Sequence, residues 1–456
     1  MKQSFFPLFL TFALHAWTGC ASAPEHERPA SPVRIQTPGL NRDALYEQCG
    51  FSPTPSNKAF HGQLDGAIDR APNALESRAL GPLLKTAEQV RDLKFKTPVP
   101  IRIQDDDFIR AYLESEIDAE ELNEAYITFG VLGLLDADAD LGTLLLDVLG
   151  EQVIGYYNPK EEYLAVRNDV VSGLAQKDTQ TFGEAHAVLV HELVHALQGQ
   201  HLNLHKLHGQ KRKTDADAAF QALVEGDATL AMIADFASAL GIPLSKLTSN
   251  LNMLDQVMPT DGFGALPAEK LRNAPPILQA MLLSPYLDGL RFVAHLHSQG
   301  GWKAVNEAYA SPPTTMSEVL HPEAADFTRK LRSKLPTMSL PKQLPLGYTL
   351  IIEDSLGELV WRSYLAQNNP RQTAIQAAEG WLQDKLGIYR NPKGRYAAVW
   401  FSDWLSETDA KEAHEAAQSA HGLSRPKSCR ACFFTSLKGR RLLITRALPP
   451  PARQVL

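Results

Sequence analysis

The sequence predicts an α+β protein in two parts: a mainly helical domain with a small sheet, and a smaller C-terminal α+β domain. The chain has 456 residues, of which 44% are hydrophobic and 21% charged, as is typical of a soluble globular protein with more than one domain. Helical periodicity dominates residues 61–340, whereas helices alternate with strands over residues 346–456. The formal net charge of −7 argues against a nucleic-acid partner.

The first residues predict export to the bacterial cell envelope. An apolar stretch, Phe5 to Ala16, is too short to span a membrane as a stable helix and is typical of a signal peptide. Trp17-Thr18-Gly19-Cys20 looks like a lipobox, so residues 1–19 are predicted to be a lipoprotein-type signal peptide and Cys20 to carry a lipid anchor. Ordinary cleavage near Ala23 is the alternative. Residues 20–60, rich in Pro and Ser, predict a flexible tether from the outer membrane or another periplasmic face.

Three cysteines remain beyond Cys20. Export permits disulfides, and the close spacing of Cys429 and Cys432 favours a structural bond between them that leaves Cys49 without a partner. A redox centre and half a zinc knuckle are the alternatives. Neither finds support in the sequence, because no second CxxC pair and no strand-then-helix pattern accompanies this one.

The helical part is predicted to contain one small sheet. Helical patterns run from about Asn73 to Leu149, interrupted at Pro98–Ile103, where the prolines indicate a short strand at a sheet edge. A hairpin follows, with strands at Gln152–Tyr157 and Glu162–Val166. The sheet edge either pairs with an extended peptide or is simply covered by packing.

The C-terminal part is predicted to hold an antiparallel sheet, after a Pro-containing linker at Leu335–Pro345. The predicted helices are Ser355–Ala366, Gln372–Leu382 and Glu407–Ala420. The predicted strands are Leu386–Tyr389, Tyr396–Phe401, Phe433–Ser436 and Arg441–Ile444.

The run TFGEAHAVLVHELVHALQGQH, from Thr181 to His201, predicts a helix that is apolar on nearly all sides and carries a metal site. His191 and His195 lie one helical turn apart, so both rings can reach one metal ion. Glu192 can hold a water molecule on the open side of that metal. Because an unpaired buried polar group costs roughly 2–7 kcal/mol, this trio is hard to explain without a metal, and we expect one zinc ion.

Two residues compete to be the third zinc ligand. His201 stands where the pattern HExxHxxGxxH has its third histidine, but Gln198 replaces the glycine of that pattern and Gly199 comes one place late. Glu225 lies on a second predicted helix, Asp217–Phe236, among small apolar residues, where a carboxylate needs a partner. We favour Glu225, with His201 as the alternative ligand and an exposed Glu225 as the non-functional interpretation.

HELVHALQGQH followed by ALVEGDAT resembles an uncharacterised family of exported prokaryotic proteins classed as zinc metallopeptidases of the gluzincin type. The likeness covers most of residues 75–447. It continues in VIGYYNPKEEYLAV, SPYLDGLRFV, GGWKAVNEAYASPPTTMSEVLHP, AAEGWLQDKLGIYR and VWFSDWLSETDA. The resemblance implies a zincin-like metallopeptidase domain over residues 61–340. In thermolysin-like enzymes an Asp four residues after the ligand Glu orients a zinc histidine; this chain has Thr229 there and Asp227 nearby, which leaves that role open.

The expected activity is zinc-dependent hydrolysis of peptide bonds in a peptide or protein substrate. Glu192 is expected to act as general base for a zinc-activated water and to pass the proton to the leaving amine. The oxyanion needs a further donor, commonly Tyr or His in zincins. Tyr286 and His321, each beside a proline, are the candidates for this stabilising role, with structural roles as the other interpretation.

The alternative function is that of a non-catalytic zinc-containing envelope lipoprotein that acts as a binding or assembly module. A purely structural zinc site usually fills its fourth position with a protein ligand and does not need Glu192, so this residue favours catalysis. A third hypothesis is a latent protease whose cleft is covered by its own C-terminal domain.

Overall fold

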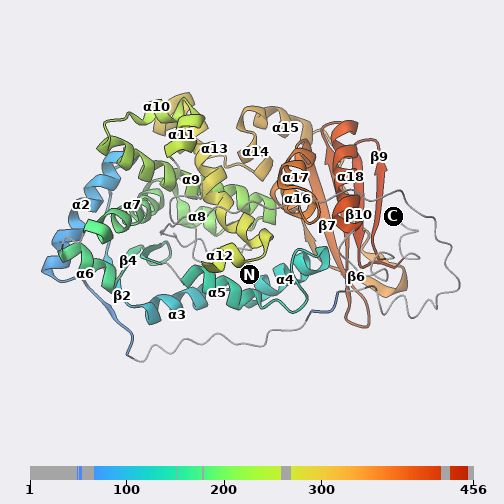
Figure 1. Cartoon of the computed structure of the whole chain (residues 1–456), viewed down its shortest axis with the longest axis horizontal. Coiled ribbons are helices and arrows are strands. Elements are labelled where there is room, and N and C mark those ends of the chain that lie inside the picture. Colours follow the sequence, from blue (N-terminus) through green and yellow to red (C-terminus); the bar gives the residue numbers. More distant parts are fainter. Residues whose placement is uncertain are drawn as a thin grey trace, which may run out of the picture.

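The computed structural model describes residues 49, 51–53, 66–150, 153–176, 179–257, 269–422 and 432–449. The predicted signal peptide, Cys20 and most of the predicted tether lie outside these residues. The described chain is a mixed α+β structure with two sheets, which confirms the predicted class. Figure 1 shows the six-stranded sheet at one end of the molecule and the helical part at the other.

Helices α2 to α15 build the helical part, and short polar side chains cap several of them. Asn73 and Glu76 form a reciprocal capping box at the start of α2, and Asp105 and Asp118 cap α3 and α4. The helices are α2 (Ala74–Arg91), α3 (Asp106–Glu116), α4 (Ala119–Leu132), α5 (Leu141–Gly150), α6 (Asn168–Gln176), α7 (Thr179–Leu202), α8 (Leu204–His208), α9 (Thr214–Ala239), α10 (Leu244–Thr248), α11 (Leu251–Val257), α12 (Glu269–Asn273), α13 (Pro276–Ala308), α14 (Met316–Leu320) and α15 (Ala325–Arg332).

A four-stranded sheet lies beside α7, and it confirms the predicted hairpin. Its strand order is β1 (Asp69–Arg70), β2 (Ile101–Gln104), β4 (Tyr163–Arg167) and β3 (Gly155–Asn158). Strands β2 and β4 are parallel and the other pairs antiparallel. The prediction that β2 is an edge strand is wrong. It lies between β1 and β4, because both prolines precede its first residue and remove no hydrogen bond from the ladder.

Helices α9 and α13 cross in direct backbone contact. A Cβ atom added at Gly226 would lie 2.2 Å from the carbonyl carbon of Gly289, and one added at Gly289 would lie 2.2 Å from the carbonyl oxygen of Ala222. The absence of side chains at both glycines therefore permits this close approach. Glu225 precedes Gly226, and Tyr286 lies one turn before Gly289, so the crossing sets the positions of both functional candidates.

We expect Gly226→Ala to lower the free energy of unfolding by about 1–3 kcal/mol, because the new methyl group must separate two packed helices. Urea denaturation of the zinc-free protein measures this loss. Gly183→Ala is the matched control: its added Cβ meets nothing within 4 Å on α7, and it is expected to stabilise the helix by about 0.5–1 kcal/mol. Equal stability of the two variants would contradict the role given to the crossing.

The C-terminal part has a six-stranded antiparallel sheet packed with three helices. The strand order is β5 (Gln343–Leu344), β6 (Tyr348–Asp354), β7 (Trp381–Arg390), β8 (Tyr396–Trp404), β10 (Arg441–Arg446) and β9 (Phe434–Lys438), and the helices are α16 (Gly357–Leu365), α17 (Arg371–Ala378) and α18 (Glu407–Gly422). Several bounds differ from prediction, and β6 falls within no predicted strand. The predicted linker already contains β5, and the helix predicted to reach Leu382 ends at Ala378, because Gly380 adopts a φ of 83° and turns the chain into β7.

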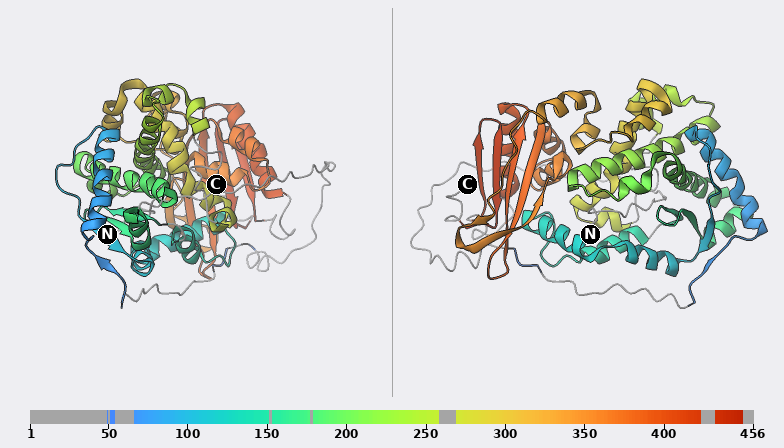
Figure 2. Two further views of the ribbon diagram at one scale, coloured as in Figure 1. Left: turned by 60° about the vertical axis from the view of Figure 1, so that its left-hand side comes forward. Right: turned by 180° about the vertical axis from the view of Figure 1, so that it is seen from behind.

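Helix α16 joins the two parts into one continuous core. It packs against α9, α13 and α14 of the helical part, and Figures 1 and 2 show it between these helices and the sheet. On its other side, Trp361 stacks on Trp400 of β8 with ring centroids 4.1 Å apart. The C-terminal part is therefore packed onto the scaffold of the helical part rather than linked to it by a free connection.

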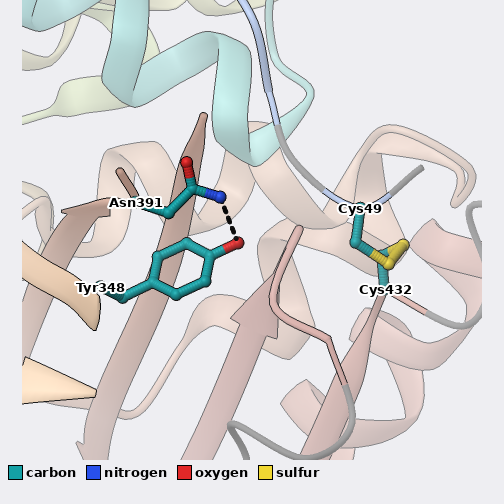
Figure 3. The surroundings of a disulfide bond; sticks show 4 residues. All are labelled: Cys49, Tyr348, Asn391 and Cys432. Carbon is teal, nitrogen blue, oxygen red and sulfur yellow. Dashed lines mark hydrogen bonds between the residues drawn. A yellow bond between two sulfur atoms is a disulfide. The ribbon is translucent and has the colours of Figure 1, made fainter. Parts of the chain in front are cut away.

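The cysteine pairing differs from prediction. Cys49 is bonded to Cys432, with Cα atoms 5.3 Å apart, whereas Cys429 lies outside the described residues (Figure 3). Phe51 exchanges two backbone hydrogen bonds with Tyr396, at 3.0 and 2.9 Å, which holds this segment against β8. Docking of a distant segment thus determines the pairing, which CxxC spacing cannot show.

The predicted tether over residues 20–60 is also corrected by this contact, because Cys49 and Phe51 are fixed to the folded protein. The ring of Phe51 lies over Gly130, where an added Cβ would come within 2.2 Å of it.

Among the helices of the described residues, none combines the length and the apolar character needed to cross a membrane.

Candidate metal centre

Helix α7 brings the two histidines of the HELVH motif together in the protein interior. His191 and His195 are 1% and 6% exposed, and their Nε2 atoms lie 3.0 Å apart. The helix packs against β3 on one side and α9 on another, so its apolar residues are covered on nearly all sides as the sequence predicts. The spacing of one turn explains why both rings point to the same place.

Glu225 of α9 completes the group. Its Oε2 atom lies 3.1 Å from Nε2 of His191 and 3.4 Å from Nε2 of His195. These three residues offer ligand atoms that all lie within 4.8 Å of one another, so the group could hold a metal ion. Tetrahedral zinc with bonds of 2.0–2.2 Å places its ligand atoms about 3.3–3.6 Å apart, close to the separations found here, so the donor set and its spacing both suit zinc.

The three groups interact strongly through their charges. Burial alone would raise the pKa of Glu225, but the charge of His195 and hydrogen bonds from both histidines lower it to about 2. Burial lowers the pKa of His195, yet Glu225 outweighs this effect and raises it to about 9. Burial holds the pKa of His191 below its usual value. The carboxylate of Glu225 is therefore in its charged form, which is the form that binds a metal ion.

Glu192 lies on the same helix, and its two carboxylate oxygens have different surroundings. Oε2 accepts a 2.7 Å hydrogen bond from the backbone N–H of Tyr157 on β3. Oε1 is buried and has no hydrogen-bond partner among the described residues. Burial raises the pKa of Glu192 to about 8. A buried carboxylate oxygen left without a donor is costly, and it is where a proton or a bound water would be accepted.

Tyr286 of α13 also lies at this group. Its ring centroid is 6.1 Å from that of His191, and its hydroxyl forms a hydrogen bond with Glu225. Burial, followed by the charges of Glu225 and Glu192, raises the pKa of Tyr286 well above its usual value. The hydroxyl therefore keeps its proton, which it donates to Glu225 beside the candidate metal ligands.

His201, the alternative metal ligand, and His321, a candidate oxyanion donor, both lie away from the metal-ligand group. Because α7 continues to Leu202 without a turn, His201 points away from the group, and its Nε2 lies 2.6 Å from the carbonyl oxygen of Lys94. His321 follows α14, and its Nε2 lies 2.9 and 3.2 Å from the carboxylate oxygens of Glu358 on α16. The structure thus brings together His191, Glu192, His195, Glu225 and Tyr286, and separates His201 and His321 from them.

Sequence reasoning missed one residue that contacts the metal-ligand group. In the sequence Gln198 stands out only as the residue that replaces a glycine, yet its Oε1 lies 2.8 Å from Nδ1 of His195. The spacing of three residues on one helix is the signal that could have shown this contact. His208 lies on α8, and its ring centroid is 5.2 Å from that of Phe220. Burial and the charge of His195 lower its pKa to about 4, while Glu225 opposes the shift, so His208 lies within electrostatic range of the group.

Comparison with known proteins concerns the C-terminal part. Residues 349–431 match a family model described as a domain of unknown function (DUF8575). No curated protein and no solved structure matches the chain. The matched residues run from β6 past α18 and contain none of the grouped residues, so the candidate metal centre is supported by its own geometry.

Proposed function

We propose that this chain is a zinc-dependent metallopeptidase of the gluzincin type that hydrolyses peptide bonds at the bacterial cell envelope, held there by a lipid on Cys20. The observation that carries the proposal is the buried Oε1 of Glu192, which has no hydrogen-bond partner in the described part of the chain and lies beside His191, His195 and Glu225. A site built only to hold the fold together has no use for such a carboxylate. This feature favours catalysis over a non-catalytic zinc-containing binding module.

Each residue has a distinct part in the proposed reaction. Zinc, when bound by His191, His195 and Glu225, supplies Lewis-acid activation of a water molecule and of the peptide carbonyl. Glu192 takes the proton of the attacking water on Oε1 and delivers it to the leaving amine, while the N–H of Tyr157 holds its other oxygen in place. The hydroxyl of Tyr286 exchanges its hydrogen bond to Glu225 for one to the oxyanion that develops on the substrate.

The four-stranded sheet supports a peptide as the substrate. Strand β3 is the last strand in the order and its residue Tyr157 turns a backbone N–H toward Glu192 rather than toward β4. An extended peptide bound along this edge would pass its backbone close to the general base. The proposal therefore places the scissile bond between β3 and the metal ligands.

Glu225→Ala and His201→Ala are expected to give opposite results, because only Glu225 belongs to the ligand group. The mature wild-type protein should contain one zinc ion and cleave unfolded protein substrates. Glu225→Ala should lose both properties, and His201→Ala should keep both. Zinc content by elemental analysis and cleavage by gel electrophoresis are the measurements. Wild-type protein that binds zinc but cleaves nothing would contradict the peptidase proposal and favour the binding module.

A further inference from the structure

A chain of buried hydrogen bonds extends from His195 into the core. Nδ1 of His195 lies 2.8 Å from Oε1 of Gln198, and Nε2 of Gln198 donates to the carbonyl of Val224 and to Oδ2 of Asp227, both at 3.0 Å. Gln198 and Asp227 are each 0% exposed. The side-chain amide of Gln198 therefore links α7 to α9 directly behind His195, one of the candidate ligands.

The partners of Gln198 determine which atom donates and which accepts in each of these hydrogen bonds. The carbonyl of Val224 and the carboxylate of Asp227 can only accept, so the amide nitrogen of Gln198 must face them. Its oxygen must then face His195, whose Nδ1 has to carry the proton in order to donate. When the ring is neutral, as it must be to bind a metal, the lone pair is therefore on Nε2, which lies 3.0 Å from Nε2 of His191 and 3.4 Å from Oε2 of Glu225.

Asp227 is itself held from two other helices. Arg91 of α2 donates from Nε and Nη2 to its two carboxylate oxygens, at 2.6 and 3.1 Å, and both side chains are fully buried. The hydroxyl of Tyr309, which directly follows α13, donates to Oδ2 at 2.8 Å. Nη2 of Arg91 also donates to Asn306 at 2.5 Å. The carboxylate of Asp227, where this series of hydrogen bonds ends, is thus held in place from α2 and from the end of α13.

We propose that Gln198 and Asp227 are positioning residues that hold His195 in the tautomer that binds zinc through Nε2. The inference rests on the proposed function, since it assigns the support of that same metal centre. Neither residue touches the ligand position itself. They act through His195, and loss of such supporting hydrogen bonds typically lowers metal affinity roughly 10–100-fold.

Gln198→Met tests the proposal, because methionine has a similar length but cannot complete the chain. We expect its zinc dissociation constant to rise roughly 10–100-fold, measured with zinc alone in competition with a chromophoric chelator. Gln200→Met is the matched control on the same helix, where Gln200 bonds to the backbone of Lys96 and Thr97; its zinc affinity should equal that of the wild type. Urea denaturation of both zinc-free variants separates loss of folding from loss of affinity. Unchanged affinity in Gln198→Met would overturn the proposal.

Nitrogen NMR of the wild-type protein gives a second test that needs no variant. We expect Nδ1 of His195 to be protonated with and without zinc, and Nε2 to be the atom whose signal shifts when zinc binds. Zinc on Nδ1, or an unprotonated Nδ1, would overturn the inference. Zinc binding with the expected tautomer but without peptide cleavage would contradict only the peptidase function. Failure of the wild type to bind zinc would overturn both.

Discussion

Glu192→Gln is expected to retain zinc and to lose peptidase activity by roughly 10²–10⁴-fold, the usual contribution of a general base. Glutamine can still accept the hydrogen bond from the N–H of Tyr157, so the local geometry should persist. It cannot take a proton at the position of Oε1, the oxygen that has no partner among the described residues. Initial rates on an unfolded protein substrate, together with zinc content, measure the effect.

Glu121→Gln provides the control for this experiment. Glu121 lies on α4, is 9% exposed, and also has a buried oxygen without a partner among the described residues. Burial raises its pKa to about 8, as it does for Glu192. Glu121 is not part of the ligand group, so this variant should keep full activity. Activity of Glu192→Gln equal to that of the wild type would end the catalytic proposal.

The parts of the site that depend on local spacing were predictable from the sequence. Once a helix is inferred over the HELVH motif, the positions of His191 and His195 follow from the helical repeat alone. Glu225 could be found because a carboxylate among small apolar residues needs a partner, and the structure groups it with the histidines. The predicted hairpin, β3 and β4, likewise follows from a short-range pattern.

The parts that depend on distant segments were not predictable. The bond between Cys49 and Cys432 forms because Phe51 docks on β8, a contact between residues hundreds of positions apart that no spacing reveals. The support of His195 by Gln198 involves neighbours on one helix, but its significance depends on Asp227 of α9. That dependence appears only when the packing of the two helices is known.

Arg91→Met is expected to lower the free energy of unfolding by about 3–5 kcal/mol, because it leaves the buried carboxylate of Asp227 without its cation. Arg91 also lies over the ring of Trp302, 4.4 Å from its centroid, so its removal loses packing as well as charge. Urea denaturation of the zinc-free protein measures the loss without the added stability that metal binding would give.

The expected loss of stability in Arg91→Met arises because the pair is buried, and two further variants test this cause. Arg441 pairs with Asp403 at 2.9 Å but its side chain is 44% exposed, so Arg441→Met should cost only about 0–1 kcal/mol. Adding Asp227→Asn to Arg91→Met should recover part of the loss, because the double variant no longer buries an unpaired charge. A loss in Arg91→Met no greater than that in Arg441→Met would contradict the stabilising role of this pair. The pair of Arg91 and Asp227 would then not stabilise the fold, and its remaining role would be to hold Asp227 in place behind the candidate metal centre.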